Sequence, residues 1–406
     1  MKNPVYLMFS HFGRINVIFK NFFIVQMTLP LRMTKALLNM IFWQYNCQIE
    51  DVMKEIEGGL SAVPGYLFSS VECGIRYTGR LDYCMIFSKD PLTASGMFTT
   101  NRVYAAPVKL CRERIDRNIH GILINATNAN ACTGDEGYNN TLKLTAEASR
   151  LLNVDKDSFL MASTGIIGHQ LPIEKMLSST SVLTSSLSGD NGRTISRAIM
   201  TTDTRPKECA REFETSIGVY HIAGTAKGSG MIAPNMATML SFIITDAPVA
   251  KYDQDEIFRR VVEKTFNAIT IDGDMSTNDT SILLSPKKSE TLAGNDLVMF
   301  ENALNDICAT LSYMLVKDAE GGTKCVTVTV KGTKDSSDAK KIAKSISESL
   351  LVKTAFFGSD PNWGRIACAA GYSGINFNQE DLDISINDLK LLCNGQPVDV
   401  DKDRLS

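Results

Sequence analysis

The stretch AKGSGMIAPNMATML, residues 226–240, combines a lysine, a Gly-Ser-Gly run, a proline and a threonine in one glycine-rich segment. The segment that follows, residues 238–245 (TMLSFIIT), is apolar and rich in β-branched side chains, so it predicts a buried strand. We expect Thr238 to begin this strand, where its hydroxyl can face a ligand while its backbone is held firmly. A plain turn into a core strand has the same pattern, so the choice between the two depends on the rest of the chain.

Helical and strand patterns alternate on both sides of this stretch. Before it, strand patterns cover residues 62–74, 81–87, 122–126 and 157–163, and a helical pattern covers residues 140–153. After it come a helix at 255–268, a strand at 281–284, a helix through 300–314, a strand at 325–330, a helix through 342–350, and a strand pair at 382–386 and 389–393. Because helices and strands are interleaved throughout, we expect a layered α/β fold.

The composition is that of a soluble globular protein of 406 residues, with 44% hydrophobic and 21% charged residues. Its net charge of −3 gives no electrostatic reason to expect a nucleic-acid partner. The ten cysteines form no CxxC pair and there are only four histidines, so we expect no metal site, and reduced thiols in the cytoplasm. No uncharged run reaches the roughly 18 apolar residues that span a bilayer, so no membrane partner is expected.

The two ends of the chain differ from its body. In residues 1–52, five basic side chains precede the first acidic one, Glu50. This leader is compatible with a presequence for the mitochondrial matrix, or with a start codon misplaced upstream of Met53. We expect it to form a disordered or loosely packed extension. At the other end, the chain stops at Ser406 without an element that would cover the edge of the predicted strand pair.

A threonine nucleophile needs a base, and histidine is the usual one. The histidines, His11, His120, His169 and His221, stand in no motif-like setting, and each is better explained as a surface or packed side chain. The chain also lacks a GxSxG nucleophile elbow. An arrangement of hydroxyl, histidine and acid is therefore poorly supported.

Cleavage of the Ala237–Thr238 bond would give Thr238 its own base, an α-amine with a pKa of about 7.7–8.0. This value is close to working pH, where a general base is most effective. Thr238 can make the cut itself if its Oγ attacks the carbonyl of Ala237 and water then releases the two pieces. Thr164 and Gly165, after the strand predicted at 157–163, offer a hydroxyl and a backbone N–H for an oxyanion, although STG alone is also a common turn.

Nine motifs in order give the chain a resemblance to the ornithine acetyltransferase (glutamate N-acetyltransferase) family of arginine biosynthesis. The resemblance runs from about Met53 to the last residues. The motifs are AVPG (62–65), FTTNRV (98–103), NANACTG (128–134), STGIIG (163–168), MTTDTRPK (200–207), AKGSGMIAPNMATML (226–240), DGDMSTNDT (272–280), DAEGGTK (318–324) and GSDPNWGRI (358–366). Each is weak alone, but chance does not explain nine of them in order.

The resemblance implies an α/β sandwich of the kind found in self-cleaving aminopeptidases. It implies an α chain of residues 53–237 and a β chain of residues 238–406, assembled as an α2β2 heterotetramer. In the family's ping-pong reaction the nucleophile, here Thr238, takes acetyl from N2-acetylornithine and passes it to glutamate without a bound cofactor. Some members also use acetyl-CoA, and the sequence does not decide whether this chain is monofunctional or bifunctional in that sense.

The resemblance also assigns site residues. Its oxyanion pair falls on Thr164 and Gly165, and its substrate-binding positions fall on Thr201, Lys227 and Glu320, besides Thr238. The charges suit these roles, because a lysine can meet a carboxylate and Glu320 can meet an amine. Considered without the resemblance, Glu320 is a solvated carboxylate before a glycine turn.

One departure bears on activity. Family members end in a strand with an asparagine and, after four residues, a serine or threonine, and both contact the substrate. Nothing after Ser406 supplies them, so we expect a C-terminally shortened β chain. Two alternatives therefore stay open. One is an N-terminal-threonine aminopeptidase or amidase, in which water accepts the acyl group, and the other is an inactive truncated product. The motifs MTTDTRPK and DAEGGTK favour the transferase.

Overall fold

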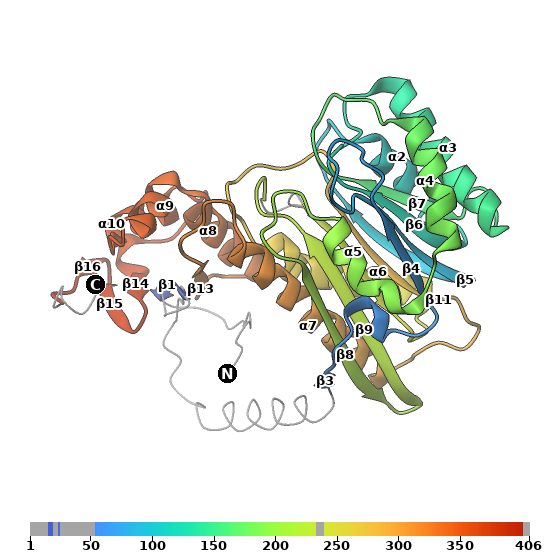
Figure 1. Ribbon diagram of the computed structural model, residues 1–406. Helices are drawn as coiled ribbons and strands as arrows, with labels where there is room; N and C mark the ends of the chain where they lie inside the picture. Colours follow the sequence, from blue (N-terminus) through green and yellow to red (C-terminus); the bar gives the residue numbers. More distant parts are fainter. Residues whose placement is uncertain (1–14, 19–22, 25–52, 233–238, 401–406) are drawn as a thin grey trace. The chain divides into compact units, whose positions relative to one another are not determined.

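The computed structural model describes residues 53–232 and 239–400 in full and the backbone of residues 15–18 and 23–24 (Figure 1). The chain forms two compact units, which we call the central unit (Trp43–Glu320) and the terminal unit (Met1–Phe42 with Gly321–Ser406). Ala237 and Thr238, and with them the predicted cleavage site, lie outside the described residues. The predicted division into α and β chains falls inside the central unit and stays a prediction.

One hydrogen-bonded sheet runs through the central unit in the order β3-β8-β9-β10-β11-β5-β6-β7, with β4 paired to β5 off this path. Its strands are β3 (Met53–Glu55), β4 (Leu67–Val71), β5 (Tyr83–Phe98), β6 (Ile119–Asn125), β7 (Phe159–Ser163), β8 (Lys207–Thr215), β9 (Gly218–Lys227), β10 (Leu240–Thr245) and β11 (Thr280–Pro286). The sheet has two parts, one made of β3, β8, β9, β10 and β11 and the other of β4, β6 and β7. The long strand β5 joins them, because its residues 83–87 pair with β4 and β6 whereas its residues 92–98 pair with β11.

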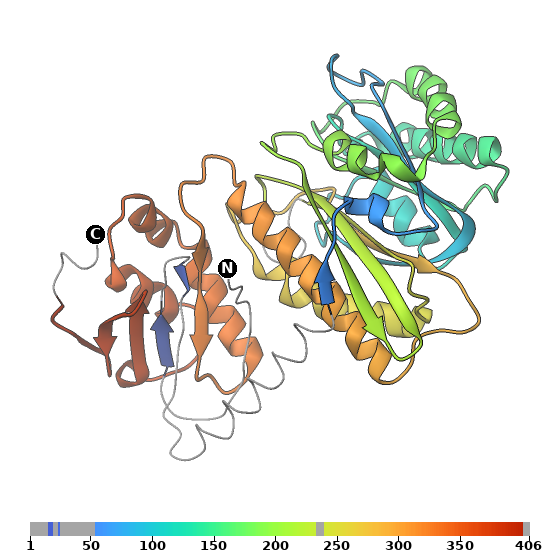
Figure 2. The ribbon, with the colours of Figure 1, turned by 60° about the horizontal axis from the view of Figure 1, so that its bottom comes forward.

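Helices pack against both parts of this sheet (Figures 1 and 2). They are α2 (Ala106–Arg114), α3 (Gly134–Leu152), α4 (Ile173–Ser185), α5 (Gly192–Ala198), α6 (Lys251–Lys264) and α7 (Asn295–Lys317), with 3-10 turns η1 (Gly59–Ala62), η2 (Gly189–Asn191) and η3 (Phe266–Ala268). Helices α3 and α4 share a core with β5, β6 and β7, and α6 and α7 share one with β8 to β11. A further core lies between the two parts of the sheet and includes residues of α2 and α5. The central unit is therefore a layered α/β sandwich, as expected.

Strand β10 shows how the sequence specifies these layers. Leu240, Phe242 and Ile244 belong to the core between the two parts of the sheet, whereas Ile243 packs with α6 and α7. A strand covered on both faces is apolar throughout, and all six residues of β10 are buried. The buried strand predicted after the glycine-rich stretch is thus confirmed, and it begins at Leu240.

In its described residues, the terminal unit combines a five-stranded sheet, in the order β13-β1-β14-β15-β16, with three helices. Its strands are β1 (Ile15–Ile18), β2 (Phe23–Ile24), β12 (Val326–Thr327), β13 (Thr329–Lys331), β14 (Leu382–Ile386), β15 (Leu389–Cys393) and β16 (Gln396–Pro397), and β2 pairs with β12. Its helices are α8 (Ser336–Glu348), α9 (Leu350–Phe357) and α10 (Trp363–Gly371), with the 3-10 turn η4 (Gln379–Asp381). Strand β1 lies between β13, to which it is antiparallel, and β14, to which it is parallel.

One expectation for the terminal unit needs correction. The strand predicted at 325–330 is divided at Val328 into β12 and β13, because each part pairs with a different segment of the N-terminal extension. Segments 15–18 and 23–24 of that extension form paired strands, and the rest of residues 1–52 lies outside the described residues, so its loose packing stays a prediction. The strand pair predicted at 382–393 is confirmed as β14 and β15, with Asn387 at φ 55° in the turn.

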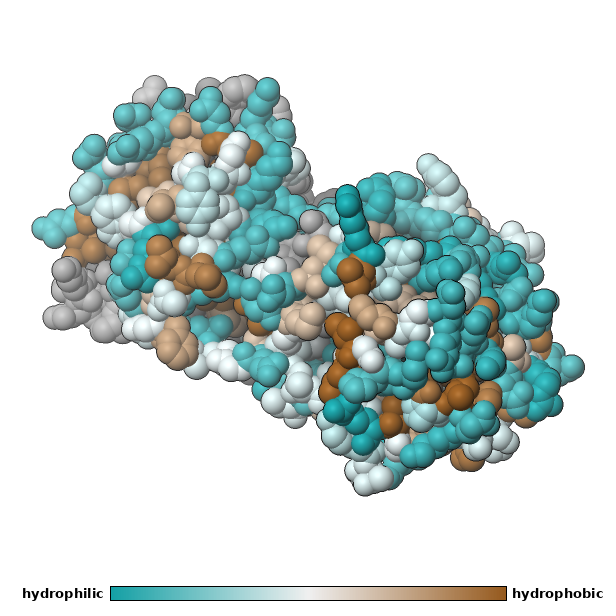
Figure 3. Space-filling model, turned by 90° about the horizontal axis from the view of Figure 1, so that it is seen from above, coloured by the Kyte–Doolittle hydropathy of each residue, from teal (hydrophilic) through white to brown (hydrophobic). Residues whose placement is uncertain are grey.

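The surface drawn in Figure 3 is mainly hydrophilic and carries separate hydrophobic patches. Within the described ranges, the structure contains no helix that combines the length and the apolar character needed to cross a bilayer.

Candidate active site

Four strand ends meet at one edge of the sheet in the central unit. Lys227, the last residue of β9, pairs with Leu240 at the start of β10. Leu240 pairs in turn with Thr280 at the start of β11, and Thr280 pairs with Phe98 at the end of β5. The loops that leave these strands are therefore neighbours, and such loops on a rigid sheet are where binding residues concentrate.

The residue that follows Thr238 is held firmly at this edge. The buried Met239 donates its N–H to Oδ1 of Asp279 at 3.2 Å, and its carbonyl accepts a hydrogen bond from Thr280 N at 3.1 Å. Asp279 is itself fully buried, and this burial raises the pKa of its carboxyl well above the ordinary value. The chain therefore enters β10 beside a buried acid.

Lys227 carries a buried ammonium group, with 3% of the residue exposed. Its Nζ donates to Oγ1 of Thr164 at 3.3 Å, and we find no other hydrogen bond from this group within the described residues. Burial lowers the pKa of the Lys227 ammonium, and the nearby carboxylate of Asp203 partly offsets that effect. An ammonium has three donors, so Lys227 keeps donors for an anionic ligand such as a carboxylate.

Thr164 and Gly165 follow β7 directly. The N–H of Thr164 donates to Asn125 O at 3.0 Å, which leaves the Thr164 hydroxyl proton and the Gly165 N–H without an acceptor in the described part of the chain. Gly165 has a φ of 137°, and a Cβ there would lie 2.1 Å from the carbonyl carbon of Thr127. Only glycine fits this backbone. The two free donors are therefore presented on a tightly packed loop.

Asn278 connects the Thr164–Gly165 loop to the segment that precedes β11. Its side-chain amide donates to the carbonyls of Ala129 at 2.6 Å and Ser163 at 2.8 Å, which belong to the NANACTG and STGIIG segments. Asn278 directly precedes Asp279, so adjacent residues hold the Thr164 loop on one side and the start of β10 on the other. This arrangement is almost entirely buried.

A buried triad of charged side chains connects the loop that contains Thr201 with the end of β9. Lys207 Nζ lies 2.6 Å from Oδ1 of Asp203 and 2.6 Å from Oδ2 of Asp318. The Asp203 carboxylate also accepts hydrogen bonds from the N–H groups of Thr201, at 3.0 Å, and Gly228, at 2.7 Å. Burial alone would raise the pKa of the Asp203 carboxyl, but Lys227 and Lys207 outweigh it and hold this pKa below its ordinary value. The triad therefore joins the loop of Thr201 to the end of β9.

The backbone of Glu320 is hydrogen-bonded to the loop that follows β9. Its N–H donates to the carbonyl of Ser229 at 2.7 Å, and Oγ of Ser229 lies 2.7 Å from Oγ1 of Thr202. The Glu320 carboxylate is exposed, and a Cβ on Gly230 would lie 2.9 Å from its Oε2. A glycine at position 230 thus makes room for this carboxylate beside the loop that follows Lys227.

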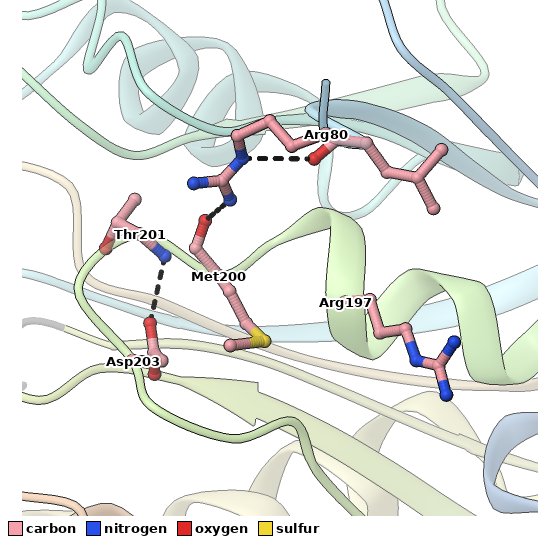
Figure 4. Close-up of a pocket in the computed structure, with 6 residues that line it drawn as sticks. Arg80, Arg197, Met200, Thr201 and Asp203 are labelled. Atoms are coloured by element: carbon pink, nitrogen blue, oxygen red, sulfur yellow. Dashed lines mark hydrogen bonds between the residues drawn. The ribbon is translucent and has the colours of Figure 1, made fainter. Parts of the chain in front are cut away.

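A pocket of about 300 Å3 lies beside Thr201 (Figure 4). It is lined by Arg80, Leu81, Arg197, Met200, Thr201 and Asp203. The Arg80 guanidinium donates to the carbonyl of Met200 and, at 3.5 Å, to that of Leu81. The region that contains Thr164, Lys227, Thr201 and Glu320 thus has a pocket next to Thr201.

Comparison with known proteins assigns the chain to a family. The model of the ArgJ family matches residues 67–406. The arginine biosynthesis bifunctional protein ArgJ of Geobacter sulfurreducens is 44% identical, over 82% of this chain and 86% of that protein. The chain belongs to the ArgJ family.

The chain is also similar to other members of the ArgJ family. The protein of the same name from Nitratidesulfovibrio vulgaris is 42% identical over 85% of this chain and 89% of its own length. Among solved structures, ArgJ from Bacillus halodurans matches with 26% identity and a TM-score of 0.43, covering 46% of this chain and 97% of that one. As an ArgJ family member, the chain is an acyltransferase of arginine biosynthesis, which confirms the resemblance found in the nine motifs.

The structure brings five residues named from the ArgJ-like motifs into one region, namely Thr164, Gly165, Thr201, Lys227 and Glu320. Their roles remain predictions, as does that of Thr238. His221, by contrast, pairs with Asp246 at 2.9 Å and lies six residues from Lys227, near the other end of β9. In the described segments, no cluster of three or more His, Cys, Asp or Glu side chains is suited to a metal ion.

Sequence reasoning missed the residues that hold the site together. They are Asp203, Lys207, Asn278, Asp279 and Asp318, all buried. A signal existed, because each belongs to a motif already recognised: MTTDTRPK, DGDMSTNDT or DAEGGTK. Four of the five are charged, and charged residues are rarely buried unless they are paired, but nothing in the sequence indicates that any of the five is buried.

Proposed function

We propose that this ArgJ family member is a glutamate N-acetyltransferase that moves acetyl from N2-acetylornithine to glutamate. The observation that carries the proposal is the 3.3 Å contact between the buried ammonium of Lys227 and Oγ1 of Thr164. This contact places a cation suited to an amino acid's carboxylate next to a hydroxyl suited to an oxyanion. Both donors lie at the edge where β10 begins, directly after Met239.

The proposed nucleophile is Thr238, freed by cleavage of the Ala237–Thr238 bond. In the cleavage, Oγ of Thr238 attacks the Ala237 carbonyl, and the bond to the Thr238 nitrogen breaks as that nitrogen takes up a proton. Water then hydrolyses the resulting ester, which leaves a carboxylate on Ala237 and a free α-amine on Thr238. That amine can act as the general base of the transfer reaction, since its pKa of about 7.7–8.0 is near working pH.

Acetyl transfer then proceeds in two halves. The Thr238 hydroxyl attacks the acetyl carbonyl of N2-acetylornithine, its proton passes through the α-amine to the departing nitrogen, and ornithine leaves. The amine of glutamate attacks the acetyl-threonine ester and regenerates the hydroxyl. In both halves the oxyanion would be held by the Thr164 hydroxyl and the Gly165 N–H.

The remaining residues bind the substrates in this proposal. Lys227 and Thr201 would hold the carboxylate on the α-carbon, and Glu320 would attract the side-chain ammonium of the donor. Acetyl-CoA is proposed as an additional acetyl donor, and two copies of each fragment are proposed to assemble as an α2β2 heterotetramer.

Cleavage gives the most direct test. We expect the purified chain to run as two fragments on a denaturing gel, with mass spectrometry placing the cut between Ala237 and Thr238. The Thr238→Ala chain should stay whole, and the Thr238→Ser chain should still be cut because it keeps a hydroxyl. A folded wild-type chain that remains uncut would remove Thr238 as the nucleophile.

Activity separates the transferase from a hydrolase. With N2-acetylornithine and glutamate, the wild-type chain should form N-acetylglutamate and ornithine in equal amounts. Release of acetate at the same rate with and without glutamate would show instead that water is the acceptor.

A further inference from the structure

In the proposed ping-pong reaction, the substrate site has to bind two amino acids whose side chains carry opposite charges. The donor, N2-acetylornithine, ends in an ammonium group, whereas the acceptor, glutamate, ends in a carboxylate. Glu320 suits the first and repels the second. If one site serves both halves of the reaction, the acceptor's side-chain carboxylate needs a cation other than Lys227, which the carboxylate on the α-carbon occupies.

The pocket beside Thr201 offers such a cation in Arg80. Its volume of about 300 Å3 lies at the lower end of the range for small-molecule sites. Arg80 and Arg197 both line it, as does the apolar side chain of Met200 (Figure 4). The pocket is therefore large enough for part of an amino acid, and the guanidinium of Arg80 lies at the loop of Met200 and Thr201.

The charges of these arginines are not compensated. The hydrogen bonds of Arg80 go to two backbone carbonyls, and neither arginine has a carboxylate within ion-pair distance among the residues that the structure describes. Asp203 is the acidic residue in the lining, but its carboxylate already binds Lys207 and two backbone N–H groups. The pocket therefore favours an anion.

Arg80 and Glu320 are connected to different residues of the loop that contains Thr201. Arg80 bonds to the carbonyl of Met200, directly before Thr201. Glu320 is joined through Ser229 to Thr202, directly after Thr201. A substrate held at Thr201 could thus direct an ammonium toward Glu320 or a carboxylate toward Arg80.

We propose that Arg80 forms the subsite for the side-chain carboxylate of the acceptor amino acid. This inference rests on the proposed transferase function and names the part of the site that distinguishes acceptor from donor. A guanidinium binds a carboxylate through two parallel hydrogen bonds, and Arg80 has N–H groups left over after its bonds to Met200 and Leu81.

Kinetics of the two half-reactions test the subsite. In the Arg80→Met chain, we expect the KM for glutamate to rise about 10- to 100-fold, the effect of losing hydrogen bonds to a charged group. The KM for N2-acetylornithine, measured from the release of ornithine, should change less than about twofold. The preference for glutamate over glutamine as acceptor should also disappear, and Arg80→Lys should keep part of it.

Arg193→Met provides the matched control, because Arg193 lies on the same helix, α5, as Arg197 but does not line the pocket. It should leave both KM values unchanged. Equal changes in both KM values, or none, in the Arg80→Met chain would overturn the subsite, since they would give Arg80 only a structural role.

Equilibrium binding separates a failure of the subsite from a failure of the proposed function. Calorimetry of glutamate against the wild-type and Arg80→Met chains needs no acetyl transfer. If the wild-type chain releases no ornithine but binds glutamate through Arg80, the transferase proposal fails and the subsite stands. If glutamate binds equally to both chains, or to neither, the subsite is refuted.

Discussion

The ammonium of Lys227, at the end of β9, contacts the hydroxyl of Thr164, directly after β7, at 3.3 Å. These residues are 63 positions apart in the sequence and belong to different parts of the folded sheet. The hydroxyl accepts from the lysine and therefore keeps its own proton to donate. A positive charge at this distance also makes the hydroxyl a stronger donor.

Removal of the Thr164 hydroxyl should slow acyl transfer with little effect on substrate binding. We expect kcat of the Thr164→Ala chain to fall about 10²- to 10³-fold, which is the usual loss for one oxyanion donor, while KM stays within a factor of about three. Steady-state kinetics with N2-acetylornithine and glutamate measure both constants. Thr164→Ser is the control and should keep most of kcat. A Thr164→Ala chain with normal kcat would show that this hydroxyl does not face the reacting carbonyl.

Substrate binding should weaken at alkaline pH because of Lys227. Burial lowers the pKa of its ammonium, so the lysine loses its charge at a lower pH than the usual value of about 10.4. The carboxylate of the substrate is bound only by the charged form. We therefore expect KM to be lowest below the lowered pKa and to rise as pH increases through it.

Lys227→Arg tests this assignment, because a guanidinium stays charged across the accessible pH range. Its KM will be higher than that of the wild type at neutral pH, since the buried space fits a lysine, but the alkaline rise should be absent. If KM of the Lys227→Arg chain still rises at the same pH, another group controls binding.

The sequence predicts the layers of this protein better than the contacts that hold its site. Strands such as β10 and helices such as α7 are long and apolar enough to be recognised from their pattern. The pairing of Lys207 with Asp318 is not recognisable, because 111 residues separate them and only the fold brings them together. Asn278 is equally hidden, since its two acceptors are backbone carbonyls, and every residue has one. The division of the strand at Val328 depends on partners from residues 15–24, far away in the sequence.

Lys207→Met should strongly destabilise the central unit. The substitution leaves the buried carboxylates of Asp203 and Asp318 without their cation, and loss of one member of a buried ion pair costs about 3–5 kcal/mol. Urea denaturation at pH 7 measures this loss in the free energy of unfolding. The matched control is Arg205→Met. Arg205 lies 3.7 Å from Asp318, but its side chain is 59% exposed, so its loss should cost at most about 1 kcal/mol.

The effect of Lys207→Met should depend on pH. The pKa of Asp203 is lowered in the folded chain, since Lys227 and Lys207 outweigh its burial. Its contribution to stability is therefore present above the unfolded pKa of about 3.9 and is lost as pH falls through the lowered folded pKa. The difference between wild type and Lys207→Met should shrink below about pH 4. A difference that stays constant down to pH 3 would contradict the ionised triad.

A chain that begins at Met53 should lose protection in the terminal unit. Without β1, the edges of β13 and β14 that now pair with it have no partner, and unpaired edges exchange their amide hydrogens faster. Hydrogen exchange should therefore speed up in residues 329–331 and 382–384. The internal control is β15, which keeps its pairing with β14. Unchanged exchange in both segments would show that β1 does not support this sheet in solution.

Asn278→Ala should lower both stability and kcat. It removes the donors to the buried carbonyls of Ala129 and Ser163, and unsatisfied buried acceptors cost about 1–3 kcal/mol. Since Ser163 directly precedes Thr164, release of this carbonyl should also misplace the oxyanion donors and reduce kcat about 10-fold or more, in line with the sensitivity of catalysis to small displacements. Urea denaturation and steady-state kinetics measure the two effects. Asn101→Ala is the control. Its amide nitrogen donates one longer bond, 3.4 Å, to Met275 O, and its oxygen accepts the exposed Val103 N–H at 2.9 Å, so its loss should change either quantity far less. A stable Asn278→Ala chain with full kcat would mean that the Thr164 loop keeps its position without the hydrogen bonds from Asn278.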